Sequence, residues 1–377
     1  MKNVVIAGYA RSPFTLAHKG SLTRVRPDDL AAQVVAALIE RTKVRAQDIE
    51  DVIVGCAFPE GEQGFNVGRL IGLLAGLPQS VAGMTVNRFC GSSMQSIHIA
   101  AGQIQLDAGD VFVAAGVESM TRVPMLGFNP LPNPTLQAKL AAYIGMGDTA
   151  ENVAGKWHIS REAQEAFAVR SQQRAAAAAK TGHFKDEIVP ILTKVGVVDT
   201  DGCLRPDTTA AALAQLKPAF SQTGTVTAGT SSPLTDGASA VLVCSEDYAA
   251  KHGLTPLARI RSVAVAGCAP DIMGIGPVGA SQKALLRAKL EMSAVDVVEL
   301  NEAFASQALA CAHDLGIRDE TLNIDGGAIA LGHPLGATGA RIVGKAASLL
   351  TRVGGRYALA TQCIGGGQGI ATILERV

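Results

Sequence analysis

Aromatic residues are scarce in this chain and a net charge is absent, and each absence limits the class of protein. Only 4% of the 377 residues are Phe, Trp or Tyr, whereas 41 are Gly. Such small residues suit helices that pack closely on buried sheets. Positive and negative side chains number 33 each, so the formal net charge is zero. Because no global basic field favours nucleic acid or an anionic membrane, we expect neither as a partner.

Long apolar runs and paired cysteines are lacking too. No stretch reaches the roughly 18 apolar residues of a spanning helix, so no membrane span is predicted. The seven cysteines are odd in number and contain no Cys-x-x-Cys pair, which favours reduced thiols in the cytoplasm. Met1 leads into a strand-like stretch without a basic leader, so we expect no secretion signal. No His, Cys, Asp and Glu set has metal-ligand spacing, and no metal is expected.

Strand and helix patterns alternate through the first third of the chain. Strand patterns occupy residues 4–9, 51–56, 83–86 and 111–117, and helical patterns occupy 27–41, 66–74 and 92–106. Such alternation predicts a parallel sheet with both faces covered by helices.

The same plan returns near the end of the chain. Strand patterns occupy 258–267, 293–300 and 357–362, helical patterns occupy 279–289 and 338–350, and a loop covers 323–336. We infer an internal duplication, because the period is too long for a solenoid. The stretch between the halves is looser and rich in proline, although Ser160 is expected to cap a helix that runs to Lys180. The predicted division is a first domain of 1–118 and 226–255, an inserted domain of 119–225, and a second domain of 256–377.

Cys90 is the first candidate for a catalytic residue. It stands at the junction between a strand end and the helical pattern of 92–106. Unpaired N–H groups and the positive end of the helix dipole gather at such a start, and they favour a thiolate by lowering the thiol pKa. The alternative is that Cys90 is simply a small core residue. We expect Cys90 to be a nucleophile.

Two further glycine-rich segments carry candidates. His333 lies in the loop that the duplication makes equivalent to the Cys90 loop, and a neutral His can take a proton from a Cys nucleophile. The alternative for His333 is a solvated loop residue. Cys363 ends the last strand pattern before Gly365, Gly366 and Gly367, which predicts an acid/base thiol beside N–H groups that bind an oxyanion. A phosphate loop is disfavoured because no Gly-Lys-Ser/Thr ending follows.

Other polar residues have more ordinary interpretations. Asn301 can fix a water or a carbonyl through its amide, and Glu302 either orients a neighbour or starts a helix. His98, His158 and His313 lie in helical patterns and are expected to be packed or on the surface. Two cysteines, one histidine and glycine-rich loops together indicate acyl transfer through a thioester, since an ordinary cysteine hydrolase does not need a second thiol.

These residues resemble the thiolase family over essentially the whole chain. The motifs that carry the resemblance are Asn87-Arg-Phe-Cys-Gly-Ser-Ser, Asn301-Glu-Ala-Phe-Ala, Gly326-Gly-Ala-Ile-Ala-Leu-Gly-His-Pro-Leu-Gly and Cys363-Ile-Gly-Gly-Gly-Gln-Gly, in family order. The resemblance implies an α/β fold with five layers, α-β-α-β-α, made of two duplicated mixed-sheet domains plus an inserted loop domain. It also implies acyl-CoA thioesters as substrates and coenzyme A as co-substrate, with no permanently bound cofactor.

The resemblance also implies a role for each residue. Cys90 is the acylated nucleophile, and His333 activates it and contributes to a first oxyanion hole with a water on Asn301. Cys363 protonates the departing acetyl-CoA carbanion. Backbone N–H groups of Cys90 and Gly365 form a second oxyanion hole. For the substrate and coenzyme A, the family-like positions are Ser232 beside the pantetheine, Arg205 against the adenine, and Met146 and Phe304.

Details of the sequence favour one branch of the family. Gly145 precedes Met146-Gly147 where biosynthetic acetoacetyl-CoA thiolases carry His, and Thr230 with 272–277 looks like the bacterial fatty-acid oxidation type. This favours thiolysis of 3-ketoacyl-CoA. The alternatives are acetyl-CoA C-acetyltransferase, a decarboxylating ketoacyl synthase, and an acyl-CoA-binding scaffold subunit. The resemblance implies a homodimer or homotetramer and allows a hydratase/dehydrogenase partner subunit, with acyl-length selectivity in 120–146.

Overall fold

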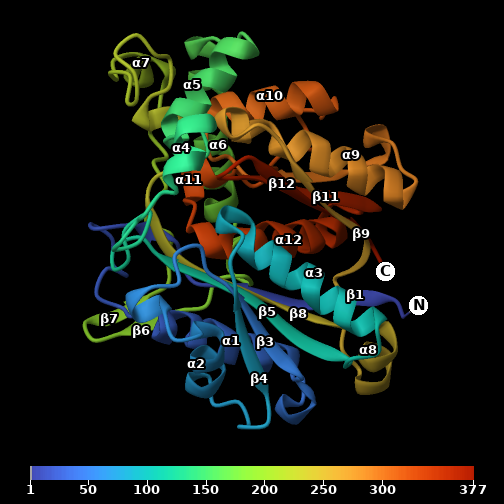
Figure 1. The fold of residues 1–377 in the computed structure, drawn as a ribbon. Coiled ribbons are helices and arrows are strands. Elements are labelled where there is room, and N and C mark those ends of the chain that lie inside the picture. Colours follow the sequence, from blue (N-terminus) through green and yellow to red (C-terminus); the bar gives the residue numbers. More distant parts are fainter. Residues whose placement is uncertain (1) are drawn as a thin grey trace.

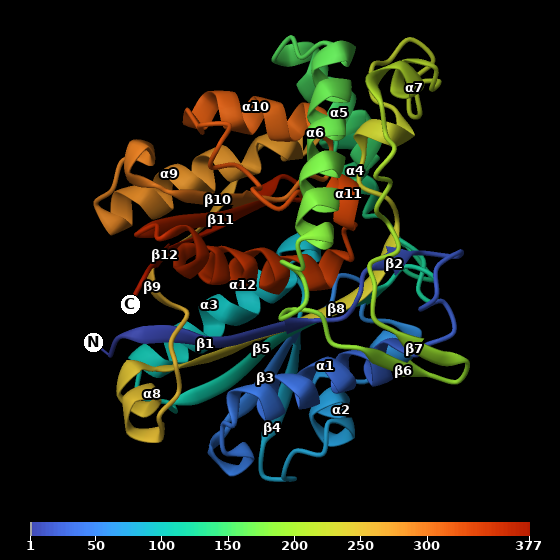
Figure 2. The same ribbon diagram turned by 180° about the vertical axis from the view of Figure 1, so that it is seen from behind.

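Five layers of helix and sheet, in the order α-β-α-β-α, build the molecule (Figures 1 and 2). The computed structural model describes residues 2–377. The strands of the first domain are β1 (Val4–Arg11), β3 (Asp51–Gly55), β4 (Ala82–Val86), β5 (Val111–Ser119) and β8 (Thr235–Ser245), with the short β2 (Thr15–Leu16) beside β8. Those of the second are β9 (Ala258–Gly267), β10 (Val297–Leu300), β11 (Tyr357–Ile364) and β12 (Gln368–Glu375).

Strand order confirms the duplication. The first half of the sheet runs β4-β3-β5-β8-β1 and the second runs β10-β11-β12-β9. In place of a fifth strand, the second half has an isolated parallel bridge between Val298 of β10 and Leu322. This bridge corresponds to the pairing of β4 with β3 in the first half. The halves join through β1 and β9, where Val5 faces Arg259 and Ile6 faces Ala258.

The prediction of a parallel sheet is wrong for part of each half. β3 runs parallel to β4 and β5, but β8 is antiparallel to both of its neighbours, β5 and β1. The second half repeats this: β10 and β11 are parallel, and β12 is antiparallel to both of its neighbours, β11 and β9. The reason is local in the second half: residues 365–367 turn β11 directly into β12, and so short a connection can join only antiparallel strands.

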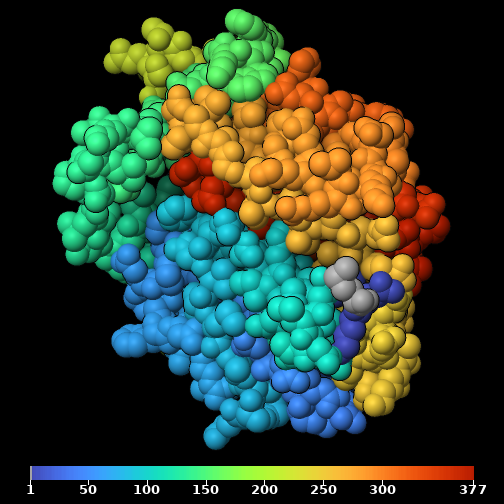
Figure 3. All heavy atoms as spheres, turned by 45° about the vertical axis from the view of Figure 1, so that its right-hand side comes forward, coloured from blue at the N-terminus to red at the C-terminus, as the bar shows by residue number. Residues whose placement is uncertain are grey.

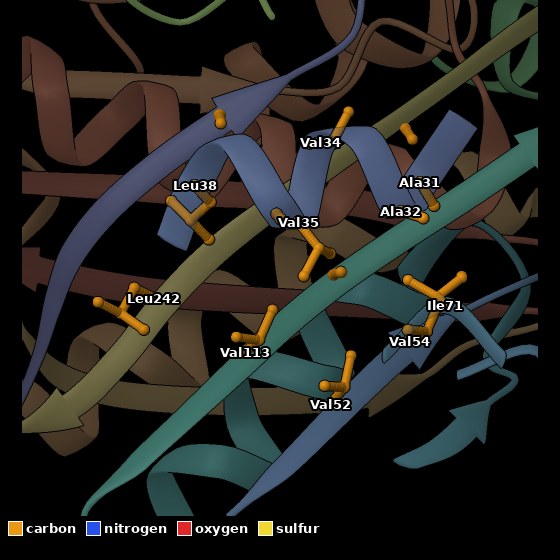
Figure 4. Close-up of a cluster of buried hydrophobic side chains, with 14 of the residues drawn as sticks. Ala31, Ala32, Val34, Val35, Leu38, Val52, Val54, Ile71, Val113 and Leu242 are labelled. Atoms are coloured by element: carbon orange, nitrogen blue, oxygen red, sulfur yellow. The ribbon is translucent and has the colours of Figure 1, made fainter. Parts of the chain in front are cut away.

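Helices cover both outer faces and fill the middle layer. The outer pairs are α1 (Pro27–Thr42) with α2 (Val67–Leu74), and α9 (Gly276–Ala288) with α10 (Ala305–Leu315); the middle pair is α3 (Ser92–Gln105) with α12 (Leu335–Val353). The short α8 (Glu246–His252) and α11 (Ala328–Leu331) lie in connections. Figure 4 shows Val35 and Leu38 of α1 packed toward Val113 and Leu242 of the first sheet. Each such side chain contributes about 1.5–3 kcal/mol by burial.

The middle layer explains why the chain has so many small residues. α12 is buried on almost every side between the two sheets. A Cβ on Gly339 would lie 2.3 Å from the Met94 amide nitrogen of α3, and one on Gly344 would lie 2.2 Å from the Tyr9 ring. Distances under about 3 Å are not tolerated, so glycine is required where α12 meets α3 and β1.

The segment between β5 and β8 lies beside the two halves. It contains α4 (Pro134–Lys139), α5 (Met146–Lys156), α6 (Arg161–Lys180), β6 (Ile191–Thr193), β7 (Gly196–Val198) and α7 (Ala210–Ala214). The predicted cap of α6 is confirmed, because Ser160 Oγ accepts from the Ala163 amide at 3.2 Å. Buried Arg11 of β1 holds this segment through Glu187 and Asp201. The exact domain boundaries given above remain a prediction.

Candidate active site

Cys90 sits where α3 begins, as the sequence predicted. It lies in a 3₁₀ turn, Phe89–Gly91, that runs into the first turn of α3. Phe89 has a φ of 42°, a left-handed conformation that costs a residue with a Cβ about 1–2 kcal/mol. Ser92 stabilises the turn, because its hydroxyl accepts from the Arg88 amide at 2.9 Å and donates to the Phe89 carbonyl at 2.6 Å.

The predicted lowering of the Cys90 pKa is wrong. Only 8% of Cys90 is exposed, and burial raises the pKa of its thiol to about 11. Hydrogen bonds from the N–H groups of Gly365 and of Cys90 itself oppose that rise, but the loss of water outweighs them. The sequence pattern located the helix start but not the second domain that covers it. Cys90 is therefore a thiol near neutral pH and needs a base.

His333 is a neutral base held in one orientation. The Thr338 hydroxyl donates to the Pro334 carbonyl at 3.0 Å, so at 2.6 Å its oxygen accepts the proton of His333 Nδ1. This assignment leaves the lone pair on Nε2. Burial, with a smaller effect of Arg341, lowers the pKa of His333 to about 3. The His333 amide donates to Thr235 Oγ1 at 3.0 Å, which anchors the loop.

Asn301 lies next to that base. It follows β10, and its amide continues the ladder by donating to the Thr361 carbonyl at 3.0 Å. Its side chain is fully buried, with Nδ2 3.4 Å from His333 Nε2. Its Oδ1 has no hydrogen-bond partner among residues 2–377. A buried amide oxygen without a protein partner fits a water or a polar substrate group.

Cys363 lies on the second domain near the end of β11, opposite Gly369. It is fully buried. Burial and then the nearby Cys90 raise the pKa of the Cys363 thiol well above its ordinary value, so Cys363 holds its proton. The glycines that follow have a structural cause as well: Gly366 and Gly367 have φ of 81° and 86°, which glycine adopts without strain.

The loops that carry Cys90 and His333 meet at the domain interface, as the duplication predicted. The Ala340 amide of α12 donates to Ser93 Oγ of α3 at 2.9 Å. A Cβ on Gly116 would lie 2.1 Å from the Gly336 carbonyl oxygen. In Figure 3, red atoms from the end of the chain lie in a hollow between the green inserted segment, the orange second domain and the blue first domain.

Glu118, a buried carboxylate at this interface, is not among the residues predicted from the sequence. It accepts from the amides of Ala57 at 2.8 Å and Gly336 at 2.9 Å, and from Gln63 Nε2 at 2.8 Å. Glu118 therefore connects the first domain to the start of α12, which begins two residues after His333. Its signal was an acidic residue directly after the apolar strand run 111–117.

Of the two interpretations of Glu302, positioning is confirmed and helix starting is wrong. The helix that follows begins only at Ala305. Glu302 instead accepts from Ser171 Oγ at 2.6 Å, Asn323 Nδ2 at 2.8 Å and the Ile329 amide at 3.2 Å. Burial raises its pKa, and these bonds oppose the rise. Glu302 thus holds the loop that leads to His333.

The substrate-side candidates fall into two groups. Met146 and Phe304 belong to the apolar cluster that contains Cys363, and a Cβ on Gly365 would lie 3.4 Å from Met146 Sδ. Ser232 lies beside them, since its amide donates to the Ala303 carbonyl at 3.0 Å.

Arg205 lies apart from the catalytic side chains. It is exposed and lines a separate cleft with Gln172, Thr208, Ala228 and Ser231. Ser231 in the lining of this cleft is the chain neighbour of Ser232. The cleft that Arg205 lines contains neither Cys90 nor Cys363.

The three histidines predicted to be packed or on the surface are so. His98 is inside α3, with Nε2 2.8 Å from Thr372 Oγ1, and burial lowers its pKa to about 3. His313 is exposed on α10. His158 is exposed in the turn after α5, rather than within a helix. Over residues 2–377, no three His, Cys, Asp or Glu side chains are grouped to hold a metal, and no helix could cross a bilayer.

A duplicated five-layer fold with two thiols and a neutral imidazole at its domain interface defines a class of proteins built for thioester chemistry. The family models agree with this class. The model of the thiolase N-terminal domain matches residues 4–247, and that of the thiolase C-terminal domain matches residues 254–376. The chain belongs to the thiolase family.

Individual relatives are similar over their full lengths. The chain is 49% identical over 389 residues to a 3-ketoacyl-CoA thiolase of Bacillus subtilis and 50% identical over 390 residues to one of Cronobacter sakazakii, covering 100% of both chains in each case. The crystal structure of human mitochondrial 3-ketoacyl-CoA thiolase superposes with a TM-score of 0.92 at 39% identity, over 100% of this chain and 99% of that one. A second crystal structure of the human protein, in complex with CoA, gives the same TM-score and covers 98% of that chain.

Proposed function

We propose that this chain is a 3-ketoacyl-CoA thiolase of fatty-acid degradation, which cleaves its substrate with coenzyme A into acetyl-CoA and a shortened acyl-CoA. The observation that carries the proposal is the pair of buried thiols, Cys90 and Cys363, at the domain interface that also holds the buried imidazole of His333. Hydrolysis needs one thiol, whereas cleavage of a carbon–carbon bond needs a second acid for the carbanion. The names of the full-length relatives support the same activity.

The first half-reaction begins at Cys90. His333 Nε2 takes the thiol proton while the sulfur attacks the 3-keto carbonyl, and the N–H groups of Cys90 and Gly365 bond to the oxygen that becomes negative. The carbon–carbon bond then breaks and leaves an acyl-Cys90 thioester. The electron pair goes to the acetyl-CoA carbanion, whose thioester oxygen is held by His333 and a water on Asn301. Cys363 donates the proton that completes acetyl-CoA.

The second half-reaction returns the enzyme to its starting state. The Cys363 thiolate takes the thiol proton of coenzyme A as that sulfur attacks acyl-Cys90, and the same two N–H groups support the second tetrahedral oxyanion. The bond to Cys90 then breaks, the shortened acyl-CoA leaves, and His333 returns its proton to the Cys90 sulfur. Read in reverse, the steps form a carbon–carbon bond, with Cys363 abstracting the proton from acetyl-CoA. We assign Met146 and Phe304 to the acyl and pantetheine side, Ser232 to the pantetheine, and Arg205 to the adenine. Coenzyme A is a co-substrate, and no permanently bound cofactor is assigned.

The cellular setting is part of the proposal. We infer a cytoplasmic enzyme, consistent with cysteines that are all unbridged. We further propose a homodimer or homotetramer that can associate with a hydratase/dehydrogenase subunit.

Two measurements test the function. Incubation with acetyl-CoA is expected to add an acetyl mass to the peptide that contains Cys90, and Cys90→Ala is expected to abolish this mass and thiolysis of 3-ketoacyl-CoA. Cys363→Ala is expected to keep acetylation of Cys90 but to lower thiolysis by a factor on the order of 100 or more, the typical contribution of a general acid. Undiminished thiolysis by Cys363→Ala would overturn the assignment of the second thiol. A wild-type protein without thiolysis on short, medium and long 3-ketoacyl-CoA esters would overturn the function.

A further inference from the structure

Arg88 links the nucleophile turn to the other domain. It directly precedes the turn Phe89–Gly91 and is half-buried. Its Nε donates to Gln95 Oε1 of α3 at 2.9 Å, within the same domain. Its Nη1 donates to Gln368 Oε1 at 2.7 Å, on β12 of the second domain. One guanidinium therefore joins α3, the helix that follows Cys90, to the opposite domain.

Gln368 stands at the tip of the hairpin that completes the site. It is paired with Ile364 in the last pair of β11 and β12 before the 365–367 turn. The Gly365 N–H of that turn is near enough to the Cys90 thiol to oppose the rise of its pKa. On β11, Gln362 donates to the Cys90 carbonyl. The β11–β12 hairpin, which also carries Cys363, thus contacts the nucleophile turn through its backbone, through Gln362 and through the bond to Arg88.

The turn needs such support because of its backbone. Phe89 is in the left-handed region, so the turn is strained and is retained only where surrounding contacts fix it. The planar guanidinium can reach two acceptors in fixed directions, which a lysine ammonium cannot reproduce. Both acceptors are neutral amides, so replacing Arg88 breaks hydrogen bonds without leaving a buried carboxylate unpaired.

We propose that Arg88 is a positioning residue that clamps the Cys90 turn to the β11–β12 hairpin and so sets the Cys90 thiol against the Gly365 N–H and Cys363. This inference rests on the proposed function. Acyl exchange between acetyl-CoA and coenzyme A uses Cys90 and His333, whereas carbon–carbon cleavage also requires Cys363 at the right distance. Loss of the clamp therefore lowers cleavage more than exchange.

The experiment compares these two reactions in matched variants. Thiolysis of 3-ketoacyl-CoA and exchange of labelled coenzyme A into acetyl-CoA are measured per active site, counted by the acetyl mass on Cys90. Arg88→Met and Gln368→Met are expected to lower the ratio of thiolysis to exchange by about 10- to 100-fold, the effect of losing a hydrogen bond to a charged group. Gln95→Met, which removes only the bond within the first domain, is expected to change the ratio less than about threefold.

A double variant and a conservative variant complete the design. The double variant Arg88→Met with Gln368→Met is expected to have the same ratio of thiolysis to exchange as Arg88→Met alone, because both substitutions remove the same bond between Arg88 and Gln368. Arg88→Lys is expected to recover part of the ratio. An unchanged ratio in Gln368→Met, or an equal loss in Gln95→Met, would refute the clamp while leaving the proposed function intact. Absence of thiolysis in the wild type would refute the function itself.

Discussion

Replacing Thr338 by Val tests how the catalytic base is prepared. The Thr338 oxygen accepts from His333 Nδ1 at 2.6 Å and its proton goes to the Pro334 carbonyl at 3.0 Å. Valine keeps the shape of threonine but removes the acceptor. Because Thr338 is fully buried and His333 is 5% exposed, no bulk water can take over the bond. The Nδ1–H is then unpartnered, or the proton moves to Nε2, the nitrogen that has to act as the base.

The expected loss follows from that choice. An unsatisfied buried donor costs about 1–3 kcal/mol, which corresponds to a rate loss of about 5- to 150-fold if it falls entirely on the base. The assay is a single turnover in which Cys90 is acetylated by excess acetyl-CoA and the acetyl mass is followed in time. The amplitude, normalised to folded protein, separates a slower reaction from a smaller amount of active enzyme.

Thr338→Ser is the matched control, because it keeps the hydroxyl and loses only a methyl group. It is expected to acetylate Cys90 within a few-fold of the wild-type rate. Acetylation by Thr338→Val at the same rate as Thr338→Ser would refute the reasoning, since it would mean that the hydroxyl does not determine which nitrogen of His333 carries the proton.

Two further predictions concern pH and packing. The pKa of His98 falls from 6.5 to about 3 on folding, so between these pH values the unfolded chain binds a proton that the folded chain does not, and stability falls as the pH is lowered. His98→Gln, which keeps a polar group beside Thr372, should reduce the slope of urea-measured stability against pH by about 1.4 kcal/mol per pH unit in this range. An unchanged slope would contradict the pKa. Gly116→Ala should lower the free energy of unfolding by several kcal/mol because its Cβ would strike the Gly336 carbonyl. Gly102→Ala in α3 meets no atom within 4 Å and should raise it by roughly 1 kcal/mol; equal effects in thermal unfolding would contradict this difference.

The sequence was sufficient for locating the candidate reactive groups because each lies within two residues of a glycine. Cys90 and His333 lie in glycine-containing turns, Cys363 lies on β11 just before the glycines of the 365–367 turn, and the duplication places the first two turns at one interface. Arg88 and Glu118 were not predictable in this way. Their partners, Gln368 and Gly336, belong to the other domain, and no local pattern records which residues meet across an interface formed by tertiary packing.

Burial by that second domain also decides how the proton moves. Burial raises the pKa of Cys90 to about 11 and lowers that of His333 to about 3, so both groups favour the neutral thiol and imidazole over a resting thiolate and imidazolium. Attraction between the two charges and the Gly365 N–H offset part of this preference, but a resting ion pair is not favoured. In the proposed mechanism the thiol therefore loses its proton as the carbon–sulfur bond forms, when the negative charge passes from sulfur to the carbonyl oxygen and the same N–H groups receive it. A buried interface that keeps both thiols protonated at rest thus fits the proposed role of Cys363 as the acid for the carbanion.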